Sequence, residues 1–284
     1  MSVIAITGAT GQLGRLVVEN LLESGIPAGD VVAVVRTPGK AADLAERGVQ
    51  VREGDYDRPD TLTTALAGVD VLLLVSGSEP GGRVAQHTAV IRAAENAGVD
   101  RIVYTSLLRA DTSPLVLAPE HKATEEILAA SALPTTILRN GWYTENYTAR
   151  LGEYLDRGVI VGATGDGLVA AATRADYAAA AAVVLTTDGH EGAVYELGGT
   201  PFTLTELAAV ITEVAGRPVT HQDVSVAELR GILTGAGLDE GTAGFVAALD
   251  EATAQGALDT DSTDLARLIG RPTTPLADAV RAAR

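Results

Sequence analysis

Three glycines near the N-terminus have a spacing that could hold a phosphate group. Gly8, Gly11 and Gly14 form the pattern G-x-x-G-x-x-G between a branched apolar run, residues 3–7, and a stretch of helical character, residues 12–24. Glycine permits a tight turn and lets the backbone approach a pyrophosphate, whose charge is favoured at a helix N-terminus. A tight turn without a ligand is the alternative. The residues expected to hold the pyrophosphate are Gly8, Ala9, Thr10, Gly11, Gln12 and Leu13.

A pair of cations follows the second branched run, residues 31–35. NAD sites usually carry an acid here for the ribose 2′-hydroxyl, whereas an arginine accommodates the 2′-phosphate of NADP. Arg36 takes this position, and Lys40, one of the two lysines in the sequence, could add a second charge. We therefore predict NADP as the cofactor, with two solvated surface cations as the alternative.

Polar residues after the third and fourth branched runs fit the same ligand. Asp55 follows residues 48–51 and could accept a hydrogen bond from the adenine amino group, although a helix cap fits it equally well. Ligands of such sheets bind beyond the carboxyl ends of the strands. The fourth run, residues 69–75, is accordingly followed by three residues expected under the nicotinamide ribose and pyrophosphate, namely Ser76, Gly77 and Ser78.

The elements that must position these residues alternate regularly. Further branched runs at residues 101–105, 135–139 and 194–197 continue this alternation. Helical stretches such as 83–97 and 120–130 lie between successive runs. Strands alternating with helices predict an open parallel sheet with right-handed crossovers. We expect an α/β protein with a Rossmann-like, doubly wound parallel sheet and a smaller, mostly helical C-terminal lobe.

A boundary between two parts is expected near residue 150. Residues 1–150 would form the NADP-binding domain, and residues 151–284 would mostly form the smaller, substrate-binding lobe. Because the run near residue 194 can rejoin the main sheet, we expect about residues 174–198 to belong to the first domain.

Composition excludes several classes of protein. The chain has 284 residues, no cysteine and a formal net charge of −16. Without cysteine it has no disulfide framework and no catalytic thiol, and its scattered histidines predict no metal site. The negative charge argues against direct binding to nucleic acid or to anionic membranes, and no apolar run approaches the roughly 18 residues of a membrane span. We predict a cytoplasmic protein, and a homodimer is left open.

Motifs along almost the whole chain carry a family resemblance. The chain resembles the short-chain dehydrogenase/reductase superfamily in its atypical NmrA-like branch, with the closest match to the type 2 NAD(P)H:quinone oxidoreductases. The glycine turn is shared by many relatives, whereas the stretch 138–147 is far more specific. The segments that carry the resemblance are Ile6–Gly14, Tyr104–Leu108, Ala110–Pro114, Leu138–Tyr147, Ala172–Ala178 and Leu268–Thr274.

One motif of that superfamily is missing. Its usual proton donor is the tyrosine of Tyr-x-x-x-Lys, but Ala118 stands four residues before Lys122 and Arg36 four before Lys40. The usual alcohol dehydrogenase or epimerase mechanism is therefore not expected. A quinone fits this departure. It can accept a hydride without a strong general acid, because the product is aromatic.

The resemblance implies roles for residues near the nicotinamide and the substrate. Thr105 and Ser106 would position a carbonyl group, unless Ser106 caps a turn, and Arg174 would add a cofactor contact. The residues implied along the nicotinamide or the substrate entry are Asn140, Gly141, Trp142, Tyr143 and Thr144.

The aromatic residues of this stretch have two interpretations. Trp142, Tyr143 and Tyr147 could stack on a flat acceptor, or they could simply pack a helix onto the sheet. Both interpretations remain open from the sequence.

Two neighbouring residues in the stretch 120–130 also have two interpretations each. Lys122 resembles the lysine that phenylcoumaran and isoflavone reductases place near the nicotinamide, or it pairs with Glu125 on a solvated face. His121 would supply the proton that a hydroquinone needs, or it is a surface histidine at a helix start.

The predicted activity is transfer of a hydride from NADPH to a quinone-like acceptor. His121, Asn140, Trp142 and Tyr143 are the expected catalytic residues. One alternative is an NmrA-like, NADP-binding redox sensor that regulates a partner without significant turnover. Another is a related reductase of azo or triphenylmethane dyes.

Overall fold

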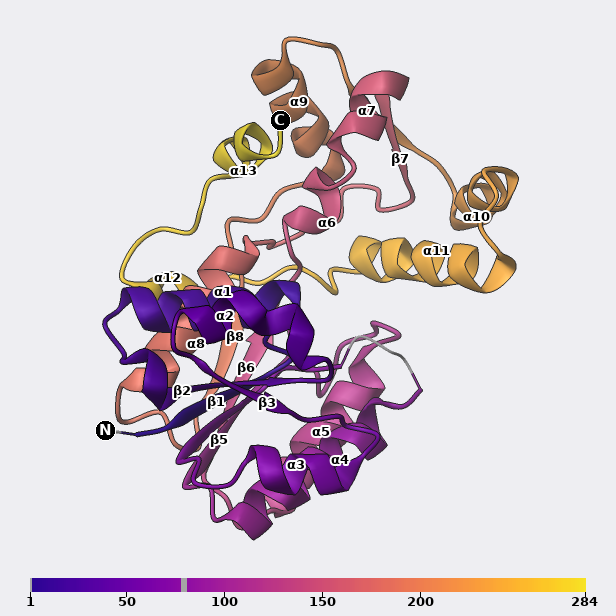
Figure 1. Ribbon diagram of the computed structural model, residues 1–284. Helices are drawn as coiled ribbons and strands as arrows, with labels where there is room; N and C mark the ends of the chain where they lie inside the picture. The colour runs from indigo at the N-terminus through magenta and orange to yellow at the C-terminus, as the bar shows by residue number, and fades with distance from the viewer. Residues whose placement is uncertain (1, 78–80) are drawn as a thin grey trace.

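The structure, a computed structural model, describes residues 2–77 and 81–284. Among these residues, seven strands form one parallel sheet in the order β3-β2-β1-β4-β5-β6-β8 (Figure 1). The order reverses between β1 and β4, which is the doubly wound arrangement expected from the sequence. The strands are β1 Ile4–Thr7, β2 Val31–Val35, β3 Gln50–Glu53, β4 Val71–Leu74, β5 Arg101–Leu107, β6 Thr135–Asn140 and β8 Val194–Leu197.

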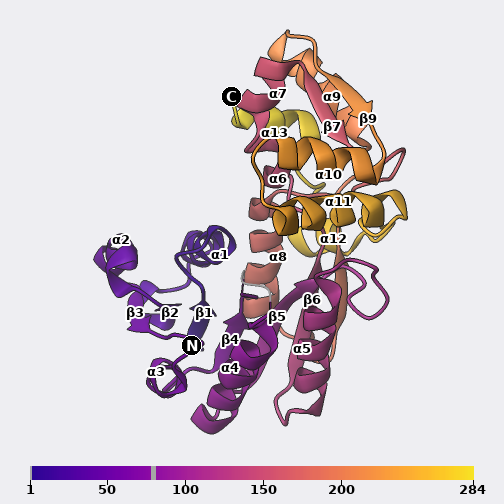
Figure 2. The ribbon, with the colours of Figure 1, turned by 90° about the vertical axis from the view of Figure 1, so that its right-hand side faces the viewer.

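Helices cover both faces of this sheet (Figures 1 and 2). Because both faces are covered, β1, β2 and β4 are buried along their whole length and consist almost entirely of apolar residues. One face carries α1 Gln12–Glu23, α2 Ala42–Glu46, α8 Arg174–Thr186 and α12 Asp264–Ile269. The other face carries α3 Pro59–Ala65, α4 Arg83–Ala97 and α5 Ala118–Ala130.

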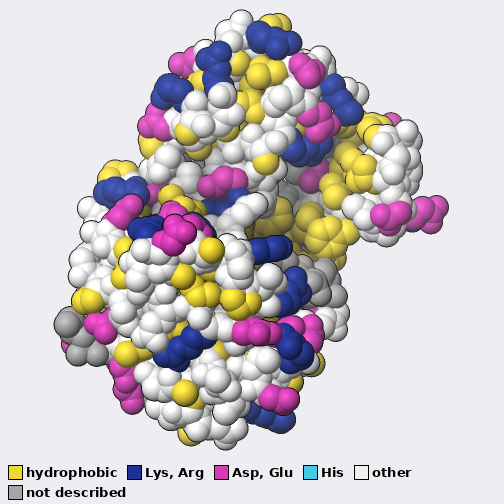
Figure 3. Space-filling model, viewed as in Figure 1, with side chains coloured by type: hydrophobic (Ala, Val, Ile, Leu, Met, Phe, Trp, Pro, Cys, Tyr) yellow, Lys and Arg dark blue, Asp and Glu magenta, His cyan; other side chains and the backbone are white. Residues whose placement is uncertain are grey.

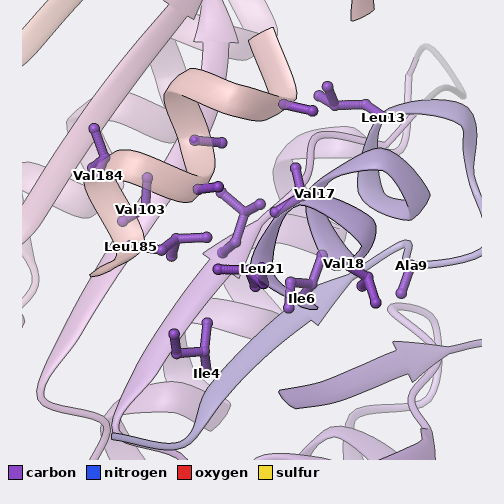
Figure 4. Close-up of a cluster of buried hydrophobic side chains, with 14 of the residues drawn as sticks. Ile4, Ile6, Ala9, Leu13, Val17, Val18, Leu21, Val103, Val184 and Leu185 are labelled. Atoms are coloured by element: carbon purple, nitrogen blue, oxygen red, sulfur yellow. The ribbon is translucent and has the colours of Figure 1, made fainter. Parts of the chain in front are cut away.

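The packing of α1 shows how the pattern of the sequence makes this core. Leu13, Val17 and Leu21 are spaced four residues apart, so they lie on one side of the helix. They face β1 and the neighbouring helix α8, where Val184 and Leu185 complete the cluster (Figure 4). The alanine-rich α8 therefore packs as a buried helix. A bridge between Tyr143 and Ala172 places the start of α8 close to the end of β6.

The C-terminal lobe packs around a second hydrophobic cluster, which also includes Leu107 at the end of β5 and Ala118 at the start of α5. Its small parallel sheet pairs β7, Val159–Gly162, with β9, Thr220–Asp223. The sequence analysis missed this pair, because the polar and largely exposed sequence of β9 lacks the apolar alternation of a strand. The helices of the lobe are α6 Glu145–Thr148, α7 Leu151–Arg157, α9 Leu204–Ala215, α10 Val226–Gly235, α11 Glu240–Ala254 and α13 Leu276–Ala282.

The third strand starts later than expected, and β8 returns the chain to the main sheet. The third strand begins at Gln50 rather than at residue 48, because Gly48 has a φ of 89° and turns the chain. β8 pairs in parallel with β6, so residues 194–197 return to the main sheet. The division at residue 150 stays a prediction. Within the described residues, no helix has the length and apolarity of a membrane span.

Candidate functional site

The carboxyl ends of the central strands open into a cavity of about 900 Å³. Its lining comes from residues at or just beyond the ends of β1 to β6, from the first turns of α4, α5 and α8, and from α6 and α11 of the lobe. Figure 3 shows the hollow between the two parts of the molecule, with apolar side chains gathered along one side of it. The cavity thus lies where the strand order reverses, which is the place where open α/β sheets bind ligands.

The glycine turn forms one wall of this cavity. Gly8 has a φ of 59°, and the Gly11 amide donates to the Gly8 carbonyl oxygen at 2.8 Å. A Cβ atom on Gly14 would lie 2.5 Å from that same oxygen, so only glycine fits there. Thr10, Gln12 and the other turn residues line the cavity, except for Ala9, which is buried beneath it. The turn and the N-terminus of α1 therefore form a cradle that fits a pyrophosphate.

The two predicted cations do not take equivalent places. Arg36 directly follows β2 and lines the cavity. Lys40 lies exposed in the short 3₁₀ helix Pro38–Ala41 and is not part of the lining. Arg36 is thus the cation positioned for a phosphate on this side of the cavity.

Asp55 lines the cavity within a tight turn after β3. Its carboxylate accepts the Asp57 amide at 3.1 Å and pairs with Arg58 at 3.2 Å. The alternative that it caps a helix is wrong, because Arg58 is the residue at the N-terminus of α3. The next residue, Tyr56, reaches under the cavity and contacts the Val75 carbonyl oxygen at 2.9 Å.

Two buried side chains hold the backbone of the segment after β4. The Ser76 amide donates to Thr105 Oγ1 at 2.9 Å, and the Gly77 amide donates to His87 Nε2 at 3.0 Å. Ser76 and Gly77 line the cavity, whereas the buried Thr105 supports them without lining it. Ser78 lies outside the described residues.

Ser106 lies inside β5, which extends two residues further than expected. The alternative that it caps a turn is therefore wrong. Its hydroxyl donates to Glu125 Oε1 at 2.5 Å, and Glu125 also pairs with Arg139 at 2.6 Å. Since its single hydrogen is used in this way, Ser106 presents lone pairs rather than a donor to the cavity it lines.

The end of β6 brings an amide side chain to the cavity. Asn140 is buried and lines it, and the Asn140 Oδ1 atom has no hydrogen-bond partner within the described chain. A Cβ atom on Gly141 would lie 2.9 Å from the Leu197 carbonyl oxygen, so glycine is required for the close passage of β8. Thr144 is buried outside the lining, and its amide donates to Ala172 at 2.9 Å. An unpartnered buried acceptor in a cavity wall fits a ligand that carries an N–H group.

The predicted aromatic cluster divides between the cavity and the lobe core. Trp142 and Tyr143 line the cavity, and the Arg174 guanidinium carbon lies 4.5 Å from the centre of the Tyr143 ring. Tyr147 instead packs edge-on against Phe202 at 5.9 Å between ring centres. Stacking on an acceptor by Tyr147 is therefore not supported.

The start of α5 places its two candidate residues on opposite sides. His121 is buried and lines the cavity, so the interpretation as a surface histidine is wrong. Burial, with the nearby Arg83 guanidinium and His87, lowers the pKa of His121 to about 3. Lys122 is exposed and outside the lining, and Glu125, its expected partner, pairs with Arg139 instead.

The sequence profile of the NAD(P)H-binding family matches residues 8–188. The chain belongs to the NAD(P)H-binding family. Over 278 residues it is 54% identical to quinone oxidoreductase 2 of Escherichia coli, covering 98% of this chain and 97% of that protein.

Two crystal structures of related reductases share the whole fold. An NADPH-dependent quinone oxidoreductase from Escherichia coli, complexed with NADPH, matches with a TM-score of 0.95 and 53% identity over 98% of this chain and 99% of that one. The triphenylmethane reductase of a Citrobacter species, complexed with NADP(H), matches with a TM-score of 0.94 and 42% identity over 99% and 100%. The expected family, fold class and NAD(P)H cofactor are confirmed, and the protein is an NAD(P)H-dependent oxidoreductase.

The structure also places at the cavity residues that the sequence did not predict. Arg83 is 4% exposed, lines the cavity, donates to the Gly77 carbonyl oxygen at 2.9 Å and pairs with Glu120 at 3.0 Å. Phe245 reaches the cavity from α11, more than one hundred residues after Trp142. The signal for Phe245 was its rarity, since the chain has only two phenylalanines.

Proposed function

We propose that this protein reduces quinone-like acceptors with NADPH. The observation that carries the proposal is the 54% identity to Escherichia coli quinone oxidoreductase 2 over 98% of the chain. The cavity supports it, because a glycine turn that fits a pyrophosphate lines the cavity and the apolar side chains of Leu117, Trp142 and Phe245 lie in its wall. NADPH, when bound, supplies the hydride, and the residues of the chain bind it, orient it and exclude water.

In this proposal the cofactor is held along the strand ends. The turn from Gly8 to Leu13 and the N-terminus of α1 hold the pyrophosphate, and Arg36 holds the 2′-phosphate. Asp55 lies on the adenine side. The segment Ser76–Gly77 supports the ribose, while Asn140 offers its unpartnered Oδ1 to the carboxamide amino group. Lys40, Lys122, Thr105 and Thr144 lie outside the lining, so we assign them no direct contact.

Catalysis in this proposal rests on holding two flat rings in reacting geometry. Trp142 and Tyr143 lie just beyond Asn140 at the end of β6, and the Arg174 guanidinium lies against the Tyr143 ring. Orientation of two reactants can lower a barrier by about 7–11 kcal/mol. The missing Tyr-x-x-x-Lys pair is consistent with this, because hydride transfer to a quinone gives an aromatic product.

The first test is NADPH oxidation by the purified protein with a panel of benzoquinones and naphthoquinones, repeated with NADH. We expect oxidation that requires a quinone and is faster with NADPH. Arg36→Ala should raise the Kd for NADPH about tenfold or more, because it removes a charge-assisted bond to the 2′-phosphate, and leave that for NADH unchanged. Lys40→Ala is the matched control and should change neither. Tight NADPH binding without oxidation by any acceptor would instead support a redox sensor.

Reduction of triphenylmethane dyes is a second candidate activity. It is favoured by the 42% identity to the Citrobacter triphenylmethane reductase over 99% of the chain. These dyes and azo dyes belong in the same acceptor panel, and a higher kcat/KM for a dye than for every quinone would make the dye the preferred class. A cytoplasmic location remains a prediction, and so does the absence of direct nucleic-acid binding, which rests on the net charge of −16.

A further inference from the structure

A buried tyrosine contacts the histidine in the cavity wall. Tyr104 lies in β5 with no exposed surface, and its hydroxyl is 2.8 Å from the Nδ1 atom of His121. The two rings pack with their centres 6.0 Å apart, at the end of a row of rings that continues through His87 to Tyr56. Nδ1 therefore points away from the cavity, into the protein, and Nε2 is the nitrogen left to meet a ligand.

The direction of this hydrogen bond follows from the chemistry of its partners. A phenol is a stronger acid than a neutral imidazole N–H, and an imidazole nitrogen is a stronger base than a phenol oxygen. Burial raises the pKa of Tyr104, so the phenol keeps its hydrogen. The favoured arrangement is thus donation from the Tyr104 hydroxyl to Nδ1 of His121.

The neighbouring histidine is held in a different way. The Gly77 amide donates to Nε2 of His87, so the hydrogen of neutral His87 is on Nδ1, 3.0 Å from Thr124 Oγ1. The Thr124 hydroxyl in turn donates to the Glu120 carbonyl oxygen at 2.9 Å. This chain ends on a backbone carbonyl, which cannot pass a proton on. The buried row of rings is therefore suited to fix tautomers and not to conduct protons.

We propose that Tyr104 is a positioning residue that holds His121 as a neutral imidazole with its hydrogen on Nε2, so that His121 donates a hydrogen bond to the acceptor's carbonyl oxygen. This inference rests on the proposed function. A neutral donor fixed in place stabilises the oxygen as it gains negative charge during reduction. The oxygen then takes its proton from water, and His121 ends the reaction neutral, with no net gain or loss of a proton.

The tautomer of His121 can be measured without turnover. Protein labelled with ¹⁵N-histidine, free of cofactor, is studied by two-bond ¹H–¹⁵N spectra from pH 5.5 to 8, and the His121→Gln spectrum assigns the signal. We expect one hydrogen, on Nε2, at every pH. In Tyr104→Phe the Nδ1 resonance should move to that of a nitrogen without a hydrogen bond, and the other tautomer should appear. A His121 that carries its hydrogen on Nδ1, or that charges in this range, overturns the proposal.

Kinetics with quinones test the positioning role. Tyr104→Phe should lower kcat about tenfold while the KM for the quinone and the Kd for NADPH stay within about twofold. Tyr154→Phe is the matched control, because it removes a hydroxyl from a buried tyrosine of the lobe core and should change neither kcat nor the His121 signal. An unchanged kcat in Tyr104→Phe contradicts the positioning role. Should Tyr104→Phe not fold, the wild-type tautomer alone decides the proposal. A wild-type protein inactive with quinones contradicts the proposed function, whereas the spectra still decide the tautomer.

Discussion

The Asp176 carboxylate, which has no exposed surface, forms an ion pair at 2.8 Å with Arg271, which lies ninety-five residues later in the chain. The same carboxylate accepts the Thr274 amide at 2.9 Å and the Thr173 hydroxyl at 2.9 Å. It thereby ties the segment after α12 to the first turn of α8. Arg174, in that same turn, lies against the Tyr143 ring in the cavity wall, so the tie also supports the site.

Loss of this carboxylate is expected to be costly for stability. Asp176→Ala should lower the free energy of unfolding by about 2–3 kcal/mol, because the Thr173 hydroxyl and the Thr274 amide lose their acceptor, whereas the half-exposed Arg271 can turn to water. Urea unfolding followed by circular dichroism measures the change. The control is Arg281→Ala, which breaks an exposed ion pair with Asp278 and should cost less than about 1 kcal/mol. Equal losses in the two variants would contradict a structural role for the tie.

Gly14 is expected to tolerate no side chain in the cofactor-bound protein. A methyl group there would displace the Gly8 carbonyl oxygen, 2.5 Å away, and deform the phosphate cradle. Gly14→Ala should raise the Kd for NADPH by about tenfold or more, as measured by calorimetry. Gly231→Ala, on α10 with nothing near its Cβ position, is the control and should bind NADPH as the wild type does. Normal binding by Gly14→Ala would argue against this turn as the pyrophosphate site.

Phe245 is expected to act on the acceptor and not on the cofactor. Its ring reaches the cavity from α11 and is 36% exposed, so it has apolar surface left for a ligand to cover. Phe245→Ala should raise the KM for naphthoquinones about tenfold, which corresponds to roughly 1–2 kcal/mol of lost apolar contact. The Kd for NADPH should not change. Ile232→Ala on α10, 41% exposed and outside the lining, provides the control. A weaker NADPH affinity in Phe245→Ala would assign the residue to the cofactor.

Stability is expected to fall in mild acid because of the buried His87 and His121, and the contribution of His87 can be isolated. Burial, with the nearby Arg83, lowers the pKa of His87 from 6.5 to about 3 in the folded protein. The unfolded chain therefore binds a proton below pH 6.5 that the folded chain refuses, so stability is full above pH 6.5 and declines towards pH 3. Between pH 7.5 and pH 5 this histidine should cost about 2 kcal/mol. Urea unfolding at both pH values should show a decline smaller by that amount in His87→Gln. Equal declines in variant and wild type would show that His87 takes up its proton in the folded protein as it does in the unfolded chain.

The amino-acid sequence by itself determined the parallel sheet and the glycine turn that we expect to hold the pyrophosphate. Both are local in the chain, because a buried parallel strand reads as a continuous apolar run and a tight turn requires its glycines at fixed spacing. The same holds for Arg36, which follows its strand directly. The sequence also showed the missing Tyr-x-x-x-Lys pair, which set the chemistry apart from that of alcohol dehydrogenases.

Only the tertiary structure decided which side chains share the cavity. His121 and Lys122 are neighbours in sequence, yet the helix turns one inward and the other to solvent. Phe245 reaches the site from a distant helix, and Tyr104 meets His121 because β5 and α5 pack together. Such contacts join residues far apart along the chain, and their geometry depends on the packing of the whole core, which residue type and spacing do not encode.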